Sequence, residues 1–529
     1  IRIYKVSQII YYKTVCSGQH RRLNSTRLPT ARMENQLSFW EKMKSYSVIG
    51  VGFFADGWAN SNIGLITPMV GYIYFQDTKN TIPVSQSGAI KAGGKIGMLV
   101  GQLVFGFLGD TLGRHKVYGR ELFFTMFGIL MCTLLPWKGL SHNGIVVWLT
   151  VGRFITGIGL GGDYPMSASL ALEKADSAAR AKVVMWTFFL SAIGYVSASI
   201  TFVILLAAFK GSIENDIHSL QWVWRLLMGL LRLALLPCLL TIYSRLTMKE
   251  TRPYEKYVRH AGSGSAADKT RSIREQLHDF RLYFSQYRHA MALFSACASW
   301  FLFDICSDGV GLNQSIVLAG IGFGKGPTPY STLWNTAVGN IIVQAAGYMP
   351  GFIFGILLIG WIGRRAQQSC SAAVIAILYA IWAGVTGTAG IGALMALFTF
   401  TQFFQLCGPN ITTFLLPVEL FPTRVRGTGH GLVAACGKSG AILTAFAFGS
   451  VEEAIGLKGV LGLFAGLQVI ITLLPAIIPE TKGYSLEDVE NDILYKKMAL
   501  DSGPLQTESA EGSEMEGAND SVVSATKGV

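Results

Sequence analysis

Residues 106–116 read GFLGDTLGRHK, a short charged turn between two apolar runs, and residues 355–365, GILLIGWIGRR, repeat that turn later in the chain. A second repeat follows each turn, because a Glu stands seven residues before an Arg in both places. A third repeat pairs KETRPYEKY (249–257) with PETKGYSLEDVE (479–490). Three repeats in the same order predict two related halves.

The composition is typical of a membrane protein. Of the 529 residues, 51% are hydrophobic and 14% are charged, whereas an ordinary soluble domain has about 25% charged residues. The apolar residues form runs of about 20, which is long enough to cross a bilayer as a helix. The net charge of +12 does not indicate nucleic-acid binding, because the basic residues lie in the breaks between apolar runs. We therefore expect an all-α membrane protein.

The apolar runs fall into two sets of six. The expected spans lie near 47–74, 88–109, 119–136, 144–170, 183–208 and 222–246, and then near 291–320, 331–360, 369–386, 389–416, 429–450 and 459–478. They divide the chain into an N-terminal segment (1–45), a first six-helix half (46–248), a cytoplasmic linker (249–290), a second six-helix half (291–480) and a tail (481–529).

Three segments outside the spans carry further expectations. The first methionine is Met33, and the basic, irregular residues 1–32 before it suggest that translation starts there. The linker is expected to be flexible around GSGSAAD, and the tail from residue 499 to be disordered, because small and polar residues dominate both.

Basic residues cluster in alternate loops. The loops after spans 2, 4, 8 and 10 hold groups of arginine and lysine, as the linker does, whereas the other loops hold mostly single lysines such as Lys79. By the positive-inside rule, the linker and both termini are expected on the cytoplasmic side.

The sequence lacks motifs for catalysis or cofactor binding. GKSG at 437–440 lies inside an apolar run with no preceding strand, so it does not indicate a nucleotide-binding loop. There is no HExxH or GxSxG, and the eight cysteines occur singly without metal-ligand spacing. We expect no catalytic residue, no metal and no cofactor.

Four blocks carry a resemblance to a known family. They are GRFITGIGLGGDYPMSASLALE (152–173), WFLFDI (300–305), GPNITTFLLPVELFPTRVRGTGHG (408–431) and GKSGAI (437–442). With the GxxxDxxGR turn, they resemble the proton-coupled inorganic phosphate transporters of fungi and plants, in the major facilitator superfamily. The resemblance implies 12 transmembrane helices and a secondary active transporter, not an enzyme, that moves dihydrogen phosphate with protons by alternating access. It implies phosphate, protons and the lipid bilayer as partners and the plasma membrane as the location, and it leaves protein partners open.

Charges inside the expected spans indicate sites of proton coupling. Asp163 lies within the fourth span, where a carboxylate costs about 2.5–3.5 kcal/mol to insert, a cost usually tolerated for function. Asp56 in the first span is a second such residue, and Arg153 could pair with either carboxylate across the bundle. The resemblance implies that Asp56 and Asp163 are the proton-coupling positions. The alternative is a static buried salt bridge with Arg153.

The resemblance also implies the substrate-binding residues Tyr164, Trp300, Asp304, Asn410 and Lys438. Trp300, Asp304 and Asp308 are spaced at i, i+4 and i+8, so we expect them on one helix face, lining one cavity. Lys438 would supply positive charge. Asp304 would accept an O–H hydrogen bond from dihydrogen phosphate, which sulfate does not offer, and would thereby exclude sulfate.

Three positions depart from the family pattern. Ser191 stands where the family has Gln, Asp308 where it has Tyr, and Ala59 where it has a second Asp. The shorter Ser191 and the added charge of Asp308 predict a wider cavity that is less favourable for a dianion. Two alternatives follow: a transporter of another small anion or sugar-like solute, or a phosphate sensor with little flux.

The repeated Glu and Arg residues are expected to form a gate at the cytoplasmic ends of spans 4 and 10. Six residues are assigned to it: Asp110, Arg114, Glu173, Arg180, Glu419 and Arg426. They are predicted to form ion-pair networks that hold the two halves together on that side. The second turn has Gly360 in place of Asp110, so the network is not expected to be symmetric. The alternative is a set of interfacial charges that fixes topology.

Overall fold

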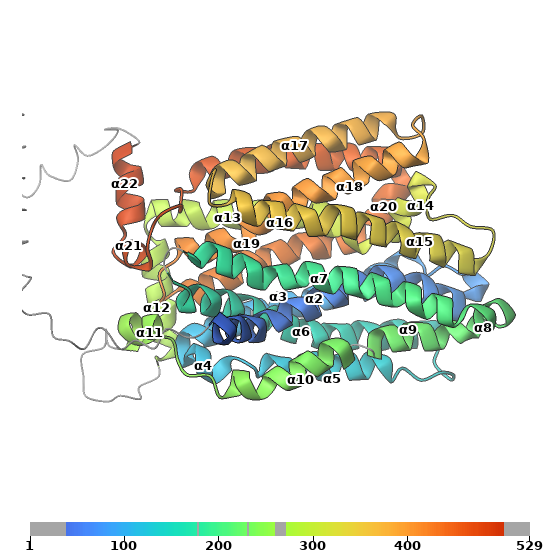
Figure 1. The fold of residues 1–529 in the computed structure, drawn as a ribbon, viewed down its shortest axis with the longest axis horizontal. Coiled ribbons are helices and arrows are strands. Elements are labelled where there is room, and N and C mark those ends of the chain that lie inside the picture. Colours follow the sequence, from blue (N-terminus) through green and yellow to red (C-terminus); the bar gives the residue numbers. More distant parts are fainter. Residues whose placement is uncertain (1–38, 177–178, 230–231, 260–270, 502–529) are drawn as a thin grey trace, which may run out of the picture. The chain divides into compact units, whose positions relative to one another are not determined.

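The computed structural model describes residues 39–176, 179–229, 232–259 and 271–501 (Figure 1). The chain separates into two units, residues 1–45 and residues 46–529, and the second holds the site described below. The expectations for residues 1–32 and Met33, for the GSGSAAD segment and for the tail beyond Asp501 lie outside the described residues.

Long helices form where the apolar runs predict them. The spans of the first half correspond to α2 (Phe39–Tyr74), α3 (Val84–Leu112), α5 (Glu121–Thr133), α6 (His142–Lys174), α7 (Arg180–Ala208) and the consecutive α9 (Leu220–Gly229) and α10 (Arg232–Leu246). Those of the second half correspond to α13 (Tyr287–Leu312) with α14 (Gln314–Ile321), α15 (Pro329–Val343) with the π-helical η6 (Gln344–Tyr348) and α16 (Met349–Leu358), α17 (Arg364–Val385), α18 (Ile391–Cys407) with α19 (Pro409–Leu420), and α20 (Arg426–Leu473). By length and composition alone, eight helices among the described residues can cross a membrane.

The last two expected spans meet at Gly456, where the backbone of α20 leaves helical geometry. Gly456 bends the helix between them with a φ of 70°, a left-handed conformation that glycine adopts without a steric penalty. The short 3₁₀ turn η7 (Leu474–Ile477) follows α20 directly. The break expected between residues 450 and 459 therefore coincides with Gly456, which divides α20 into two helical segments.

Two regions expected as loops contain short helices. The linker includes α11 (Arg252–Tyr254), the π-helical η5 (Glu255–Arg259) and α12 (Ile273–Phe284). A capping box starts α12, because the Ser272 hydroxyl accepts a hydrogen bond from the Glu275 N–H and the Glu275 carboxylate accepts one from the Ser272 N–H. The tail includes α21 (Leu486–Glu490) and α22 (Ile493–Asp501), so helix continues past residue 499.

The repeated turn has the same backbone in both halves. Gly113 has a φ of 98° and Gly363 a φ of 85°, values that favour glycine. Each glycine lets the chain change direction directly after a span. Arg114 then begins α4 (Arg114–Val117) and Arg364 begins α17, so the two arginines stand at equivalent places.

Helix α3 packs against both α6 and α20, and it therefore joins the first half of the chain to the second. The approach to α20 is close. A side-chain carbon on Gly431 would collide with the carbonyl oxygen of Gln102, and one on Gly106 would collide with the carbonyl oxygen of Gly427. The glycines at this crossing allow the two backbones to touch.

The charged turns gather at one end of the helices of this unit, where α4, α11, α12 and α21 also lie (Figure 1). The short helix α8 (Lys210–Asn215) lies at the opposite end. We call the first of these the charged end.

Candidate functional site

A cavity of about 70 Å³ lies between helices from the two halves of the chain. Its polar and charged lining residues are Asp56, Asn60, Lys95, Tyr164, Ser191, Tyr195, Asp304, Ser307, Asp308, Tyr348, Asn410 and Lys438. The first six belong to α2, α3, α6 and α7, and the rest follow the linker. A solute bound here would contact both halves.

Most of the predicted substrate-binding residues line this cavity, namely Tyr164, Ser191, Asp304, Asp308, Asn410 and Lys438. Trp300 is not among its described lining residues. The Trp300 indole packs against Phe414 and His430, with ring centroids 6.4 and 5.9 Å away. It also fills the space beside Gly437, where an added side-chain carbon would collide with it. Asp304 and Asp308 share the cavity as their spacing predicts, and the role of each residue as a ligand stays a prediction.

Ion pairs cross the cavity. The Nζ of Lys438 lies 2.8 Å from Oδ2 of Asp304 and 3.5 Å from Oδ2 of Asp308. The other oxygen of Asp308, Oδ1, lies 2.8 Å from Nζ of Lys95. With Asp56, the lining holds three carboxylates and two ammonium groups.

Lys95 is the charged lining residue that the sequence analysis missed. It lies in the apolar run of α3 and is 1% exposed. A signal was present, since Lys91 and Lys95 stand one helical turn apart inside an expected span, where a charge is as costly as that of a buried aspartate. Lys91 also turns toward the second half, because its Nζ donates to Oδ1 of Asn313 at 2.8 Å.

Asp56 faces the cavity from α2. The Tyr164 hydroxyl donates to its Oδ2 at 2.6 Å, and the Asn60 amide donates to its Oδ1 at 2.7 Å. Both donors are neutral. Asp56 can therefore gain or lose a proton without breaking an ion pair with any of the described residues.

Asp163 lies in a different environment, a buried charge cluster. Its Oδ1 is 2.6 Å from Nη1 of Arg245, and the same guanidinium nitrogen is 3.0 Å from Oε1 of Glu121. The Ser167 hydroxyl donates to Asp163 at 2.8 Å. Asp163 is not among the described residues that line the cavity.

The predicted pairing of Arg153 with Asp56 or Asp163 is wrong. The Nε of Arg153 donates to the carbonyl oxygen of Ile90 at 2.9 Å, and its side chain lines a separate pocket. Ten residues along a helix correspond to about 15 Å, so Arg153 stands too far along α6 to reach Asp163. Arg245 approaches Asp163 from α10 instead.

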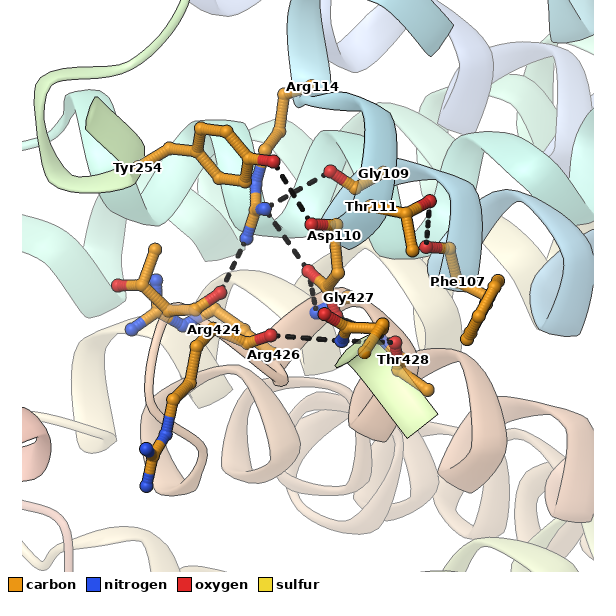
Figure 2. A network of polar contacts seen from close by, with 12 residues as sticks. Phe107, Gly109, Asp110, Thr111, Arg114, Tyr254, Arg424, Arg426, Gly427 and Thr428 are labelled. Atoms are coloured by element: carbon orange, nitrogen blue, oxygen red, sulfur yellow. Dashed lines mark hydrogen bonds and ion pairs between the residues drawn. The ribbon is translucent and has the colours of Figure 1, made fainter. Parts of the chain in front are cut away.

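At the charged end, Asp110 binds the start of α20 (Figure 2). Its Oδ1 accepts a hydrogen bond from the Gly427 N–H at 3.0 Å, and its Oδ2 accepts from the N–H and hydroxyl of Thr428 at 2.7 and 2.8 Å. The free N–H groups and dipole of a helix N-terminus stabilise such a carboxylate. Arg114 lies 3.1 Å from Asp110 and donates to the Thr423 carbonyl at 2.9 Å. Both residues thus bind the second half directly.

Glu173 joins the same network. Its Oε1 lies 3.3 Å from Nη2 of Arg114 and 2.9 Å from Nη1 of Arg426, and its Oε2 accepts a hydrogen bond from the Thr251 hydroxyl. Burial alone would lower the pKa of Arg114, but the carboxylates of Glu173 and Asp110 raise that pKa above its ordinary value. Four of the predicted gate residues therefore form one buried, charged network across the two halves.

In the second Glu and Arg repeat, the two residues bind different partners. Glu419 binds Arg364 of its own half, at 2.8 and 2.9 Å, and not Arg426, which reaches across to Glu173. Arg180 is the first residue of α7 and is partly exposed. Each Glu ends one helix and each Arg begins the next, so the seven-residue spacing spans a turn and does not align the two side chains.

The arrangement suits a small polar or anionic solute. The two ammonium groups supply positive charge, Tyr164 and Asn410 supply neutral hydrogen-bonding groups, and the carboxylates can accept hydrogen bonds from hydroxyl groups. In the described part of the chain, no group of three or more His, Cys, Asp or Glu residues could hold a metal ion.

Comparison with known proteins agrees with this fold. The family of sugar (and other) transporters matches residues 46–493. The inorganic phosphate transporter PHO84 of Saccharomyces cerevisiae is 30% identical over 90% of this chain and 88% of that protein. A repressible high-affinity phosphate permease of Neurospora crassa is 30% identical over 88% of this chain and 89% of that protein.

Solved structures show the same architecture. The major facilitator superfamily proton:xylose symporter XylE, bound to 6-bromo-6-deoxy-D-glucose, superposes with a TM-score of 0.64 at 18% identity, covering 85% of this chain and 98% of XylE. The predicted all-α, 12-helix transporter fold is confirmed. The chain therefore belongs to the family of sugar (and other) transporters within the major facilitator superfamily, and it is a multi-pass membrane transporter rather than an enzyme.

Proposed function

We propose that this protein is a symporter that carries inorganic phosphate, as dihydrogen phosphate, together with protons by alternating access. The two relatives that are named for phosphate support this cargo. The observation that carries the proposal is the ion pair between Lys438 and Asp304 inside the cavity, at 2.8 Å. The lysine supplies charge for an oxyanion, and the carboxylate beside it accepts the O–H hydrogen bond that dihydrogen phosphate offers and sulfate does not.

The charges of the cavity link the anion to a proton. Three carboxylates and two ammonium groups leave one net negative charge, and a bound monoanion adds a second. In a site screened from water, this excess favours protonation of a carboxyl group. Asp56 is the best placed to take the proton, because its hydrogen-bond donors are neutral. Asp163 would contribute to proton coupling from its cluster with Arg245 and Glu121.

Alternating access would use the charged end as the cytoplasmic gate. The clusters of basic residues in the loops at that end favour the cytoplasmic side for it and for both termini. The plasma membrane is the proposed location. The halves 46–248 and 291–480 would rock about the cavity, and the network of Asp110 and Glu173 would form in one state and break in the other.

Asp308 and Ser191 favour a second candidate function, the transport of another small anion or a sugar-like solute. Asp308 places a carboxylate in the lining, where it disfavours dianions, and the Ser191 hydroxyl already donates to the Phe188 carbonyl at 2.8 Å. A solute with hydroxyl groups and little charge would suit these two residues.

Uptake of labelled phosphate into proteoliposomes that contain the full chain tests the proposal. We expect an inward proton gradient to drive uptake and excess sulfate to leave it unchanged. Lys438→Ala and Asp304→Ala should each lower uptake at least about tenfold, because each removes a charged contact with the anion. Lys458→Ala is the matched control, since Lys458 is exposed on the same helix, and it should transport like the wild type.

The outcomes separate the cargo from the coupling. Phosphate uptake that does not depend on the proton gradient would overturn the symport mechanism. Phosphate would then remain the proposed cargo. Absence of phosphate uptake in protein that transports another labelled solute would favour the second candidate. Asp56→Asn and Asp163→Asn, compared under the same gradient, would assign the proton to the cavity carboxyl or to the Arg245 cluster.

A further inference from the structure

Asp308 contacts both lysines of the cavity at once. Its Oδ1 lies 2.8 Å from Nζ of Lys95, and its Oδ2 lies 3.5 Å from Nζ of Lys438. The two oxygens of one carboxylate thus sit between two ammonium groups. Two oxygens of a tetrahedral oxyanion have a similar separation and the same preference for ammonium donors.

We propose that Lys95 and Lys438 form a two-lysine clamp for the transported anion. Asp308 occupies the clamp in this structure and leaves it when the anion binds. The inference rests on the proposed transport of phosphate. It adds Lys95 as a second cationic ligand, which would determine affinity together with Lys438.

The environment of Asp308 suits a residue that moves. Its side chain is 15% exposed toward the cavity, against 6% for Asp304. Its contact with Lys438 is also the longer of the two that this lysine makes, at 3.5 Å against 2.8 Å. Asp304 can therefore keep its hold on Lys438 while Asp308 gives way to an anion.

The clamp would draw one lysine from each half of the chain. Lys95 belongs to α3 and Lys438 to α20, so an anion bound to both would hold the halves together around the cavity. One turn along α3, Lys91 contacts Asn313, which directly follows α13. The same face of α3 thus contacts the second half at two positions one turn apart.

Asp308 would also influence which anions bind. It competes with every anion for both lysines and so lowers affinity in general. Once displaced, it can accept a hydrogen bond from an O–H group of dihydrogen phosphate. Sulfate offers no such donor and would place a dianion beside an unpaired carboxylate.

Binding of labelled inorganic phosphate to the purified full chain, measured without transport, tests the clamp. Asp308→Asn should strengthen phosphate binding several-fold, because the carboxylate that competes with the anion for the two lysines is removed. The decisive comparison adds Lys95→Met to the Asp308→Asn background, where no carboxylate at position 308 needs a counter-ion. If Lys95 binds the anion, this second change should weaken phosphate binding at least about tenfold.

Two further variants serve as a control and as a replacement for Lys95→Met. Lys91→Met in the same background is the control, since Lys91 is buried on the same face but outside the cavity lining, and it should change binding less than about twofold. Lys95→Gln serves as a second variant if Lys95→Met gives no monodisperse protein. A loss below about twofold on removing Lys95 beside Asn at 308 would overturn the clamp and leave phosphate transport intact. A wild-type chain that fails to bind phosphate would instead overturn the proposed function and the clamp with it.

Discussion

The repeated turn is built alike in the two halves, yet its copies bind different partners. In each copy, one glutamate binds an arginine and a threonine. The arginine directly follows a glycine with a positive φ, and the threonine follows the last span of its half. The two sets are Arg114, Thr251 and Glu173 in the first half and Arg364, Thr481 and Glu419 in the second. The equivalence extends to single hydrogen bonds, although the chain segments are more than 200 residues apart.

The copies differ in what reaches the other half. Glu173 also binds Arg426, and Asp110 binds the start of α20, so the first copy crosses between the halves. Glu419 binds an arginine of its own half, and Gly360 stands in place of Asp110. The comparison separates two tasks. The repeated set holds each turn in shape, while Asp110, Arg426 and the hydrogen bond of Arg114 to the Thr423 carbonyl hold the two halves together.

Removal of the shared carboxylate should have the largest effect and should be unequal between the copies. In Glu173→Gln, Arg114 and Arg426 stay buried and lose the negative charge between them, which we expect to cost about 3–5 kcal/mol. In Glu419→Gln, one arginine partner is affected and the carboxylate is 11% exposed, so we expect about 1–3 kcal/mol. Thermal unfolding of the two purified variants measures the difference. Equal losses of unfolding free energy would show that the two copies contribute equally to stability.

Asp110→Asn should shift the halves apart at the charged end with a smaller loss of stability, about 1–3 kcal/mol. Asparagine keeps one acceptor oxygen for the N–H group of Gly427 or Thr428, turns its NH2 donor toward the other, and loses the charge that binds Arg114. Spin labels at Arg120 and Arg424, both exposed and in different halves, report the separation by pulsed electron resonance.

The control for this experiment is Asp176→Asn, which removes an exposed acid at the same end of α6. We expect longer label distances in Asp110→Asn and unchanged distances in the control. Unchanged distances in both variants would contradict a role for Asp110 in holding the halves together.

The missing acid of the second copy can be supplied. Gly360 has an ordinary backbone and is exposed, and a side-chain carbon added there would lie 3.9 Å from Cε of Lys182, near the start of α7. In Gly360→Asp, we expect the new carboxylate to bind Lys182 and add about 0.5–1 kcal/mol to the closed charged end, as an exposed ion pair does. Phosphate uptake should turn over more slowly with an unchanged KM. Gly360→Asn, which lacks the charge, should behave like the wild type. If it slows phosphate uptake as much as Gly360→Asp does, the effect comes from the size of the side chain and not from its charge.

The sequence was sufficient to predict the spans and six of the residues that line the cavity, and it was insufficient for the ion-pair partners. Bilayer thickness sets the length of an apolar run, so the runs could be counted without a structure. Asp163 shows the limit, because its partner Arg245 lies 82 residues away and only helix packing brings the two together. Arg153 was chosen by its nearness in sequence, which says little across a helical bundle.

Lys95 shows a different failure, since its signal was visible. The reasoning that singled out Asp163 as a costly charge in a span applies equally to Lys95 and Lys91.

Tyr254→Phe alters the first copy alone, and its expected effect is as small as that of Gly360→Asp. The Tyr254 hydroxyl donates to the Asp110 carbonyl oxygen at 3.0 Å, and its ring lies 4.5 Å from the Arg114 guanidinium. Phenylalanine keeps the ring, so we expect a loss of about 1 kcal/mol from the hydrogen bond. Burial raises the pKa of Tyr254 to about 12, above the value near 10 in an unfolded chain. The contribution of the hydroxyl is therefore full below about pH 10 and is lost as the pH rises through about 12. Melting temperatures of wild type and variant should differ by a constant amount from about pH 6 to about pH 9 and approach each other above pH 10. If the difference in melting temperature already decreases below about pH 9, the Tyr254 phenol ionises at a lower pH than expected. The hydrogen bond to the Asp110 carbonyl oxygen would then not stabilise its protonated form.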